Sequence, residues 1–207
     1  MIRILALVPH CMKILLIGDV HAQTRKFNLL LAKHEPEYSI QLGDFGLREQ
    51  HNWFLQSLDV TRHKIIFGNH DYIPYLSKPH SLGDWSFPFE GMMTIRGADS
   101  IDRRFRMTGV NWWVNEEMPF VRLKACIAAY KAACPEIVVS HECPHIVRRK
   151  VFGIHDISRT ALGMQECLEA HRPKFWYFGH HHSSVRRVID GTTFIGLNEM
   201  ETAWVER

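Results

Sequence analysis

The stretch KILLIGDVH, residues 13–21, joins a short apolar run to a carboxylate and an imidazole. Residues 13–18 have the length and unbroken hydrophobicity of a strand that is buried on both faces. Asp19 and His21 follow with one residue between them. In an extended chain, residues i and i+2 project to the same side, so both side chains can reach one cation while Val20 points into the fold. The stretch therefore predicts a buried strand that ends in a metal-competent loop.

The same arrangement recurs four more times along the chain. Further apolar runs occupy residues 38–43, 64–68, 136–140 and 174–179. The polar loops that end these runs read GDFG at 43–46, GNHD at 68–71, SHECP at 140–144 and GHHH at 179–182. Ligands of open α/β sheets bind at the carboxyl ends of the strands, so five loops far apart in sequence can converge on one cleft.

Helical patterns alternate with these strands. We expect helices over residues 24–34, 48–58, 121–133 and 158–171, and antiparallel strands over residues 105–113 and 185–197. A strand, a helix and a second strand in succession are typical of a β-α-β unit. The pattern predicts one α/β domain over residues 1–207, with two sheets covered by helices.

Composition limits the classes of protein to be considered. The chain is 46% hydrophobic and 23% charged, which excludes a disordered chain. The formal net charge of +3 is too small to indicate a nucleic-acid partner by itself, although it permits an anionic substrate. Histidine, the commonest metal ligand, occurs 14 times.

The beginning of the chain and its cysteines bear on location. Pro9, His10 and Lys13 interrupt the early apolar stretches, so we expect no membrane span and no membrane partner. Five scattered cysteines without a paired spacing favour a reducing compartment, which predicts a cytoplasmic protein. Residues 1–11 are expected to be a loosely attached extension, with Met12 as an alternative start.

The polar loops offer a mixed set of metal ligands. Asp44 has two carboxylate oxygens that can bridge two cations about 3.5–4 Å apart. Asn69 adds an amide oxygen and His141 an imidazole, and such nitrogen and oxygen donors suit manganese, iron, zinc, nickel or cobalt. Each loop alone has a structural explanation, since Gly-Asp is a common turn and an isolated histidine is usually hydrogen-bonded. The occurrence of all five in order favours a metal site.

These ordered blocks, DxH, GD, GNHD, a lone histidine and GHxH, resemble the signature of the calcineurin-like metallophosphoesterases over residues 13 to about 197. The resemblance implies a four-layered α/β/β/α sandwich with two mixed sheets flanked by helices. It also implies two divalent metal ions, manganese first, with iron, zinc, nickel, cobalt or magnesium as alternatives. One ion would be held by Asp19, His21, Asp44 and His182, and the other by Asp44, Asn69, His141 and His180.

The resemblance also implies a reaction. A hydroxide that bridges the two metals would attack phosphorus in line, without a covalent intermediate. His70 would contact the phosphate and protonate the leaving oxygen, and Asp71 would orient the His70 ring.

If GHHH is extended, side chains alternate, so His180 and His182 face the cleft while His181 faces away and is replaceable.

The chain departs from the family signature at two positions. The second block reads GDFGLRE, so the phosphate-binding arginine of the Ser/Thr protein phosphatases is missing, and Arg48 lies one residue later. Ala22 stands where the family usually has glycine. GNHD followed by SHECP resembles the phosphodiesterase and nuclease-type members of the family, so we expect a phosphodiesterase acting on a nucleotide or nucleic acid. The alternatives are a phosphomonoesterase, including a protein phosphatase of another type, and a binding scaffold that has lost catalysis.

Residues 92–117 are expected to form an insertion near the cleft, and residues 97–117 resemble a stretch of small phage and bacterial members. Arg103, Arg104 and Arg106 with Trp112 and Trp113 can bind phosphate and stack a base. Alternatively, this segment is a hairpin whose tryptophans cover the core while its arginines are solvated. The same choice between a polyanion site and a charged loop face applies to Arg148, Arg149, Lys150, Arg186 and Arg187. The oligomeric state is left open.

Overall fold

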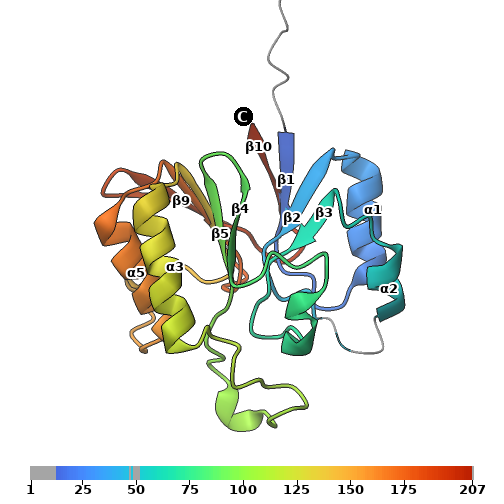
Figure 1. Ribbon diagram of the computed structural model, residues 1–207, viewed down its shortest axis with the longest axis horizontal. Helices are drawn as coiled ribbons and strands as arrows, with labels where there is room; N and C mark the ends of the chain where they lie inside the picture. The colour runs from blue at the N-terminus through green and yellow to red at the C-terminus, as the bar shows by residue number, and fades with distance from the viewer. Residues whose placement is uncertain (1–12, 47, 49–51, 207) are drawn as a thin grey trace, which may run out of the picture.

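Two β-sheets lie face to face between two layers of helices in the computed structural model, which describes residues 13–46, 48 and 52–206 (Figure 1). The expected extension at residues 1–11 and the alternative start at Met12 lie outside the described residues. This arrangement confirms the predicted four-layered α/β/β/α sandwich with two mixed sheets.

The first sheet contains the strand that precedes the Asp19–His21 loop. Its four strands have the order β10-β1-β2-β3, in which β1, β2 and β3 run parallel and β10 pairs antiparallel to β1. The strands are β1 (Lys13–Ile17), β2 (Tyr38–Gln41), β3 (His63–Ile65) and β10 (Thr202–Glu206). The α1 helix (Thr24–His34), the α2 helix (Asn52–Ser57) and a 3-10 turn, η2 (Ile73–Ser77), cover its outer face.

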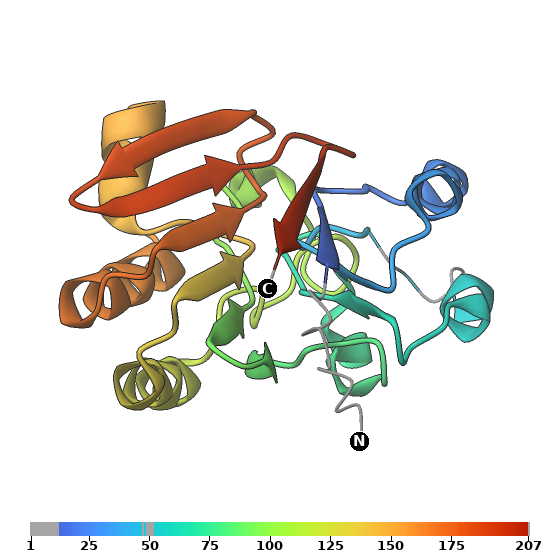
Figure 2. The same ribbon diagram turned by 90° about the horizontal axis from the view of Figure 1, so that it is seen from above.

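The second sheet has six strands in the order β4-β5-β6-β7-β9-β8. The central strands β5, β6, β7 and β9 are parallel, and β4 and β8 pair antiparallel at the two edges. The strands are β4 (Trp85–Phe89), β5 (Met92–Ile95), β6 (Ile137–Ser140), β7 (Phe175–Phe178), β8 (Val185–Ile189) and β9 (Thr192–Gly196). The helices of this half are α3 (Phe120–Ala133), α4 (His145–Phe152) and α5 (Arg159–Ala170), which lie on its outer side (Figure 2).

The alternation of side chains along β1 explains why every residue after Lys13 in that strand is buried. Ile14 and Leu16 pack between the two sheets, whereas Leu15 and Ile17 pack under α1 and α2. Successive side chains of a strand point to opposite faces, so a strand in an inner layer needs apolar residues throughout. Val20 is also fully buried, as the sequence predicted.

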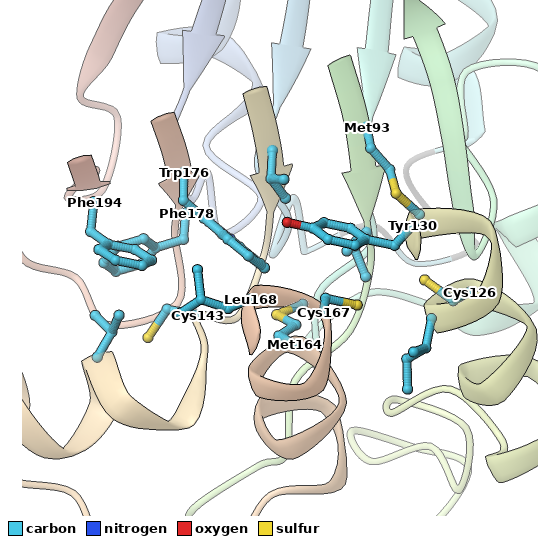
Figure 3. Close-up of a cluster of buried hydrophobic side chains, with 14 of the residues drawn as sticks. Met93, Cys126, Tyr130, Cys143, Met164, Cys167, Leu168, Trp176, Phe178 and Phe194 are labelled. Atoms are coloured by element: carbon cyan, nitrogen blue, oxygen red, sulfur yellow. The ribbon is translucent and has the colours of Figure 1, made fainter. Parts of the chain in front are cut away.

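A third cluster joins the second sheet to its helices (Figure 3). Tyr130 of α3 stacks on Trp176 of β7 with ring centroids 6.2 Å apart, and its hydroxyl donates to the carbonyl of His171. Cys126, Cys143 and Cys167 lie buried in the same cluster. Within the described chain these three and the exposed Cys134 are free thiols, and the three buried cysteines act as apolar packing groups.

Most expected elements are present with small shifts of their ends. The helices expected at 24–34, 121–133 and 158–171 are α1, α3 and α5, and the strands expected within 185–197 form the β8–β9 hairpin. Residues 52–57 of the expected helix at 48–58 form α2, while residues 49–51 lie outside the described chain. Strands β4, β5 and β10 and helix α4 were not predicted. Within the described residues, no helix is both long and apolar enough to cross a bilayer.

The prediction of strands over residues 105–113 was wrong. This part of the chain starts in a 3-10 turn, η3 (Arg103–Phe105), and continues as tight turns. The N–H groups of Val110, Asn111 and Trp112 all donate to the Met107 carbonyl, so local bonds occupy the amides that a strand would pair. The expected insertion at residues 92–117 begins inside the second sheet with β5, and its remainder forms the lobe between β5 and α3 in Figure 1.

Candidate metal centre

The polar loops after β1, β2, β3, β6 and β7 meet at one edge of the two sheets. Four of their non-glycine residues, His21, Asp44, His180 and His182, have φ between 44° and 65°, in the left-handed region. This conformation turns the chain sharply and is uncommon for side chains other than glycine, asparagine or aspartate. Strained backbone of this kind is often found at functional sites.

Hydrogen bonds tie the loops to one another. The Asp44 carbonyl accepts the N–H groups of Val20 and His21 at 3.0 and 2.9 Å, and the Asp44 carboxylate accepts the His70 N–H at 2.7 Å. The Asp19 carboxylate accepts the His180 N–H at 3.1 Å. Three loops from the first sheet and one from the second are thereby fixed together.

Asp19, His21 and His182 form the first group of candidate ligands. Their ligand atoms all lie within 4.8 Å of one another. His182 Nε2 is 3.1 Å from Asp19 Oδ2 and 3.0 Å from His21 Nε2. Two imidazoles and a carboxylate that converge in this way form a donor set suited to a transition-metal ion.

Asp44, His141 and His180 form the second group, with the same 4.8 Å limit. His141 Nε2 lies 3.4 Å from Asp44 Oδ1 and 3.1 Å from the amide oxygen of Asn69. Asp44 also belongs to a group with His21, so it faces ligands of both sets. The structure thus brings together all seven residues that the sequence predicted as metal ligands.

Buried charges in the second group support a cation at this position. Burial raises the pKa of Asp44, but the neighbouring His141 outweighs it and holds that pKa well below its usual range. Burial lowers the pKa of His141, but Asp44 outweighs this effect and raises it to about 10. A protonated His141 therefore balances the Asp44 carboxylate in this structure, and a bound metal ion would supply that positive charge and release the proton.

His180 provides the clearest test of whether a metal fits. Burial lowers the pKa of His180 to about 3, so its ring is neutral, as a metal ligand must be. Its Nδ1 atom is buried and has no hydrogen-bond partner among the described residues. A buried, unpaired imidazole nitrogen costs free energy unless it binds something, and a metal ion would satisfy it. The donor set fits two divalent cations.

The backbone leaves little space around these ligands. A Cβ atom at Gly68 would meet the Asp44 carboxylate and the His141 ring, and one at Gly179 would meet Asp19 Oδ1. Glycine is therefore required where the strand ends approach the ligands most closely.

The side chains of His70 and Asp71, the predicted catalytic pair, have different partners in this structure. The His70 ring enters the cleft, where burial chiefly lowers its pKa. Both oxygens of the buried Asp71 carboxylate accept backbone N–H groups, from Gly46 and Gly68, each at 2.8 Å. Asp71 thus joins the GD and GNHD loops, whereas the sequence predicted that it orients the His70 ring.

A second chain of hydrogen bonds supports Asn69, and the sequence did not reveal it. The Asn69 amide nitrogen donates to Ser100 Oγ at 3.1 Å, which leaves its oxygen directed towards His141. Ser100 in turn donates through both its hydroxyl and its N–H to the buried Glu116 carboxylate, at 2.6 and 2.9 Å. Residues from the 97–117 segment therefore fix the orientation of a candidate ligand, a common role for groups behind a metal site.

Glu142 supports the histidines of GHHH, and His181 lines the cleft beside His180 and His182, which corrects the prediction that His181 faces away from it. Glu142 Oε1 is 2.8 Å from His181 Nε2, and Oε2 is 3.7 Å from His180 Nε2. His181 also stacks on Phe152 with ring centroids 4.2 Å apart. The predicted alternation requires an extended loop, but His180 and His182 are left-handed. Glu142 stands next to His141 in SHECP, and that proximity to a ligand was the only sequence signal for it.

Replacing Glu142 with glutamine is expected to weaken metal binding by the Asp44–His141–His180 group about 10- to 100-fold. The amide removes the negative charge beside His180 and His181 while preserving the shape of the side chain. Titration of the metal-free chain with Mn²⁺ measures the effect. His181→Ala should weaken binding less, because it removes one neighbour of this carboxylate. The control is Glu169→Gln, an exposed glutamate of α5 that accepts a hydrogen bond from Gln165. Equal Mn²⁺ affinities for the two glutamine variants would contradict the proposed role of Glu142.

A cleft of about 530 Å³ opens over the ligands. Its polar wall includes Asp44, Asn69 and His70, and its basic side chains are Arg106 and Arg148. Ile101, Phe152 and Ile154 form the apolar part of the wall. The cleft therefore combines candidate metal ligands, two cations and an apolar surface.

The basic and aromatic residues that the sequence offered as possible contacts to phosphate or base lie in three settings: the cleft, the packed interior of the lobe and the exposed surface. Trp112 is buried under the Arg103 guanidinium, 4.1 Å away, and the Trp113 ring packs against Tyr72. Arg104 lies over the exposed Phe105 ring, outside the cleft, and Arg149, Lys150, Arg186 and Arg187 are exposed. Both tryptophans are therefore engaged in packing, and Arg106 and Arg148 are the arginines that line the cleft.

Comparison with known proteins identifies the family to which this sequence is similar. The sequence model of the family described as calcineurin-like phosphoesterase matches residues 12–184. No curated protein matches the chain. A crystal structure of a dimetal phosphatase from Danio rerio is similar with a TM-score of 0.55 and 14% identity, covering 91% of this chain and 88% of that one. A phosphopantetheinyl hydrolase from Mycobacterium tuberculosis gives a TM-score of 0.48 and 12% identity, covering 91% and 90%.

The family match covers every loop that contributes a candidate ligand, from Asp19 to His182. The structural similarity to the dimetal phosphatase independently shows the same fold. From its sequence and its architecture together, the chain belongs to the calcineurin-like phosphoesterase family.

Proposed function

We propose that this protein is a dinuclear metal-dependent phosphoesterase that hydrolyses phosphodiesters, with a nucleotide or nucleic acid as the substrate type. The single observation that carries the enzyme assignment is the junction at Asp44, whose carboxylate belongs to one ligand group with His141 and His180 and to another with His21. A carboxylate shared in this way is typical of two-metal phosphoesterases.

The residues of the chain have distinct parts in this proposal. Asp19, His21, Asp44 and His182 would hold one ion, and Asp44, Asn69, His141 and His180 the other. Two divalent cations, with manganese as our first choice, would lower the pKa of water and neutralise phosphoryl oxygens. His70 would bind the phosphate and donate a proton to the leaving oxygen, and Asp71 would hold the GNHD loop against the GD loop.

The wall of the cleft supports the preference for a diester. A phosphodiester carries a single negative charge and an organic group on each side of phosphorus. The apolar side chains of Ile101, Phe152 and Ile154 offer a surface for the second organic group. We also propose a cytoplasmic location, which the buried free thiols of the second-sheet core support.

A phosphomonoesterase is the second candidate, and a specific observation favours it. Arg106 and Arg148 both line the cleft, and two cations suit the doubly charged phosphate of a monoester. A scaffold without catalysis is disfavoured, because His70 lines the cleft together with the candidate ligands Asp44, Asn69, His180 and His182.

Turnover of bis-p-nitrophenyl phosphate and p-nitrophenyl phosphate by the Mn²⁺-loaded chain tests the proposal. We expect a higher kcat/KM for the diester, loss of both activities on chelation, and recovery when Mn²⁺ is restored. A strong preference for the monoester would contradict the diester assignment alone. Failure to hydrolyse either ester with any divalent metal of the predicted set would contradict the enzymatic function.

A further inference from the structure

The lobe formed by residues 97–117 is anchored firmly at its base. Arg96, buried at the end of β5, donates to the carbonyls of Asn115 and Glu116 at 2.8 and 3.2 Å and pairs with Asp84 at 2.7 Å. The Gly97 N–H donates to the Phe67 carbonyl, next to the GNHD loop. The two ends of the lobe are therefore held together beside the candidate metal centre.

Arg106 extends from this lobe into the cleft. Its Nε lies 2.6 Å from Asp102 Oδ1, and its Nη2 lies 2.7 Å from Nε2 of His70. Only 7% of the Arg106 side chain is exposed, whereas the Asp102 side chain is 48% exposed. Asp102 therefore forms an ion pair with the Nε side of the guanidinium, without an aligned hydrogen bond at Oδ1, and the Nη2 side is directed at His70 within the walls of the cleft.

This contact has an unusual chemistry. A guanidinium has only donors, so His70 Nε2 must accept the hydrogen bond from Arg106. A neutral imidazole does not compensate the charge of the desolvated guanidinium, whereas an anionic acceptor such as a phosphoryl oxygen would pair with that charge. A phosphoryl oxygen placed between the two groups can accept from Arg106, and also from His70 once Nε2 has taken up a proton from solvent. The guanidinium fork also matches the geometry of phosphate oxygens.

We propose that Arg106 is a substrate-binding residue, which contacts a non-bridging phosphoryl oxygen, and that Asp102 is the residue that positions it. The inference rests on the proposed phosphoesterase function. In this chain the GDFGLRE block lacks the arginine that GDxVDRG would supply, and Arg106 reaches the phosphate from the lobe instead. Substrate binding replaces the bond between Arg106 and His70 with bonds from each residue to the same phosphoryl group.

The test compares Arg106→Gln, Arg106→Lys and the wild-type chain, all loaded with Mn²⁺. Calorimetric titration with inorganic phosphate measures binding without turnover, and hydrolysis of bis-p-nitrophenyl phosphate gives KM. We expect Arg106→Gln to raise the Kd for phosphate and the KM about 10- to 100-fold, the effect of losing a hydrogen bond from a charged group. Arg106→Lys should recover part of the phosphate affinity, because it keeps the charge and loses the fork.

The matched control is Arg104→Gln, in the same turn but outside the cleft, which should leave both constants unchanged. A phosphate Kd for Arg106→Gln within twofold of the wild type would overturn the inference, whatever the change in KM. If thermal melting shows that Arg106→Gln does not fold, Asp102→Asn serves in its place. It should weaken phosphate binding while the chain stays folded, and unchanged binding would again overturn the inference. A wild-type chain that binds Mn²⁺ and phosphate but hydrolyses neither ester would disprove the proposed function alone.

Discussion

Asp44→Asn is expected to reduce turnover by roughly 10³-fold or more, because removal of a metal cation's charge stabilisation costs several kcal/mol in the transition state. The Asp44 carboxylate reaches ligands of both groups, so its loss affects both ions. Asparagine keeps the size of the side chain and tolerates the φ of 52° at this position. The amide nitrogen cannot bind a cation, and it places a donor beside His141.

Metal analysis of the purified variant distinguishes this result from unfolding. We expect fewer than two Mn²⁺ ions per chain, with an unchanged pattern of secondary structure by circular dichroism. Asp190→Asn is the matched control. Asp190 also has a left-handed backbone, with a φ of 48°, but it lies in the exposed β8–β9 turn. Full occupancy by two ions in Asp44→Asn would show that Asp44 is not shared between the metals.

His70→Ala is expected to lower kcat by about 10²–10⁴-fold, the usual contribution of a general acid, with metal content unchanged. The backbone N–H of His70, not its ring, bonds to the Asp44 carboxylate, so alanine leaves this support of the metal centre in place. In the present structure Nε2 accepts from Arg106 and carries no proton. Proton donation therefore requires that a substrate oxygen replaces Arg106 as the partner of this nitrogen and that the nitrogen takes up a proton from solvent.

Comparison of leaving groups makes the role of His70 specific. An ester of p-nitrophenol has a good leaving group that needs little protonation, whereas an alkyl ester depends on the acid. The defect of His70→Ala should therefore be much larger for the alkyl ester. An equal loss on both esters would assign His70 to phosphate binding alone. His155→Ala, on the exposed loop after α4, is the control that should alter neither rate.

The parts of the fold that were predicted from sequence have strong local signals. The run KILLIG has apolar residues at every position because β1 is buried on both faces, between the sheets and under α1. Helices α1, α3 and α5 have periodic apolar faces of ordinary length. By contrast, β10 was missed because its burial depends on pairing with β1, at the opposite end of the chain.

In the lobe, the prediction from local sequence was wrong. A strand was predicted over residues 105–113, yet its apolar residues Phe105, Met107 and Val110 are all more than half exposed. Their apolar side chains do not meet a neighbouring strand, and the amides of this segment are satisfied by turns. Alternating hydrophobicity predicts a strand only when a second strand is available to pair with it.

The sequence by itself determined the five loops, their order and the candidate ligands Asp19, His21, Asp44, Asn69, His141, His180 and His182. The loops follow from residue types and from positions directly after apolar runs, both of which are local properties. The grouping of the candidate ligands into two metal sites follows from the resemblance of these loops to the family signature. Only the tertiary structure decided which side chains support them. Glu142 lies against both His180 and His181, Ser100 and Glu116 orient Asn69, and Arg106 reaches His70. Such contacts join residues from different loops, and their geometry is set by how the two sheets and the lobe pack, which no local pattern encodes.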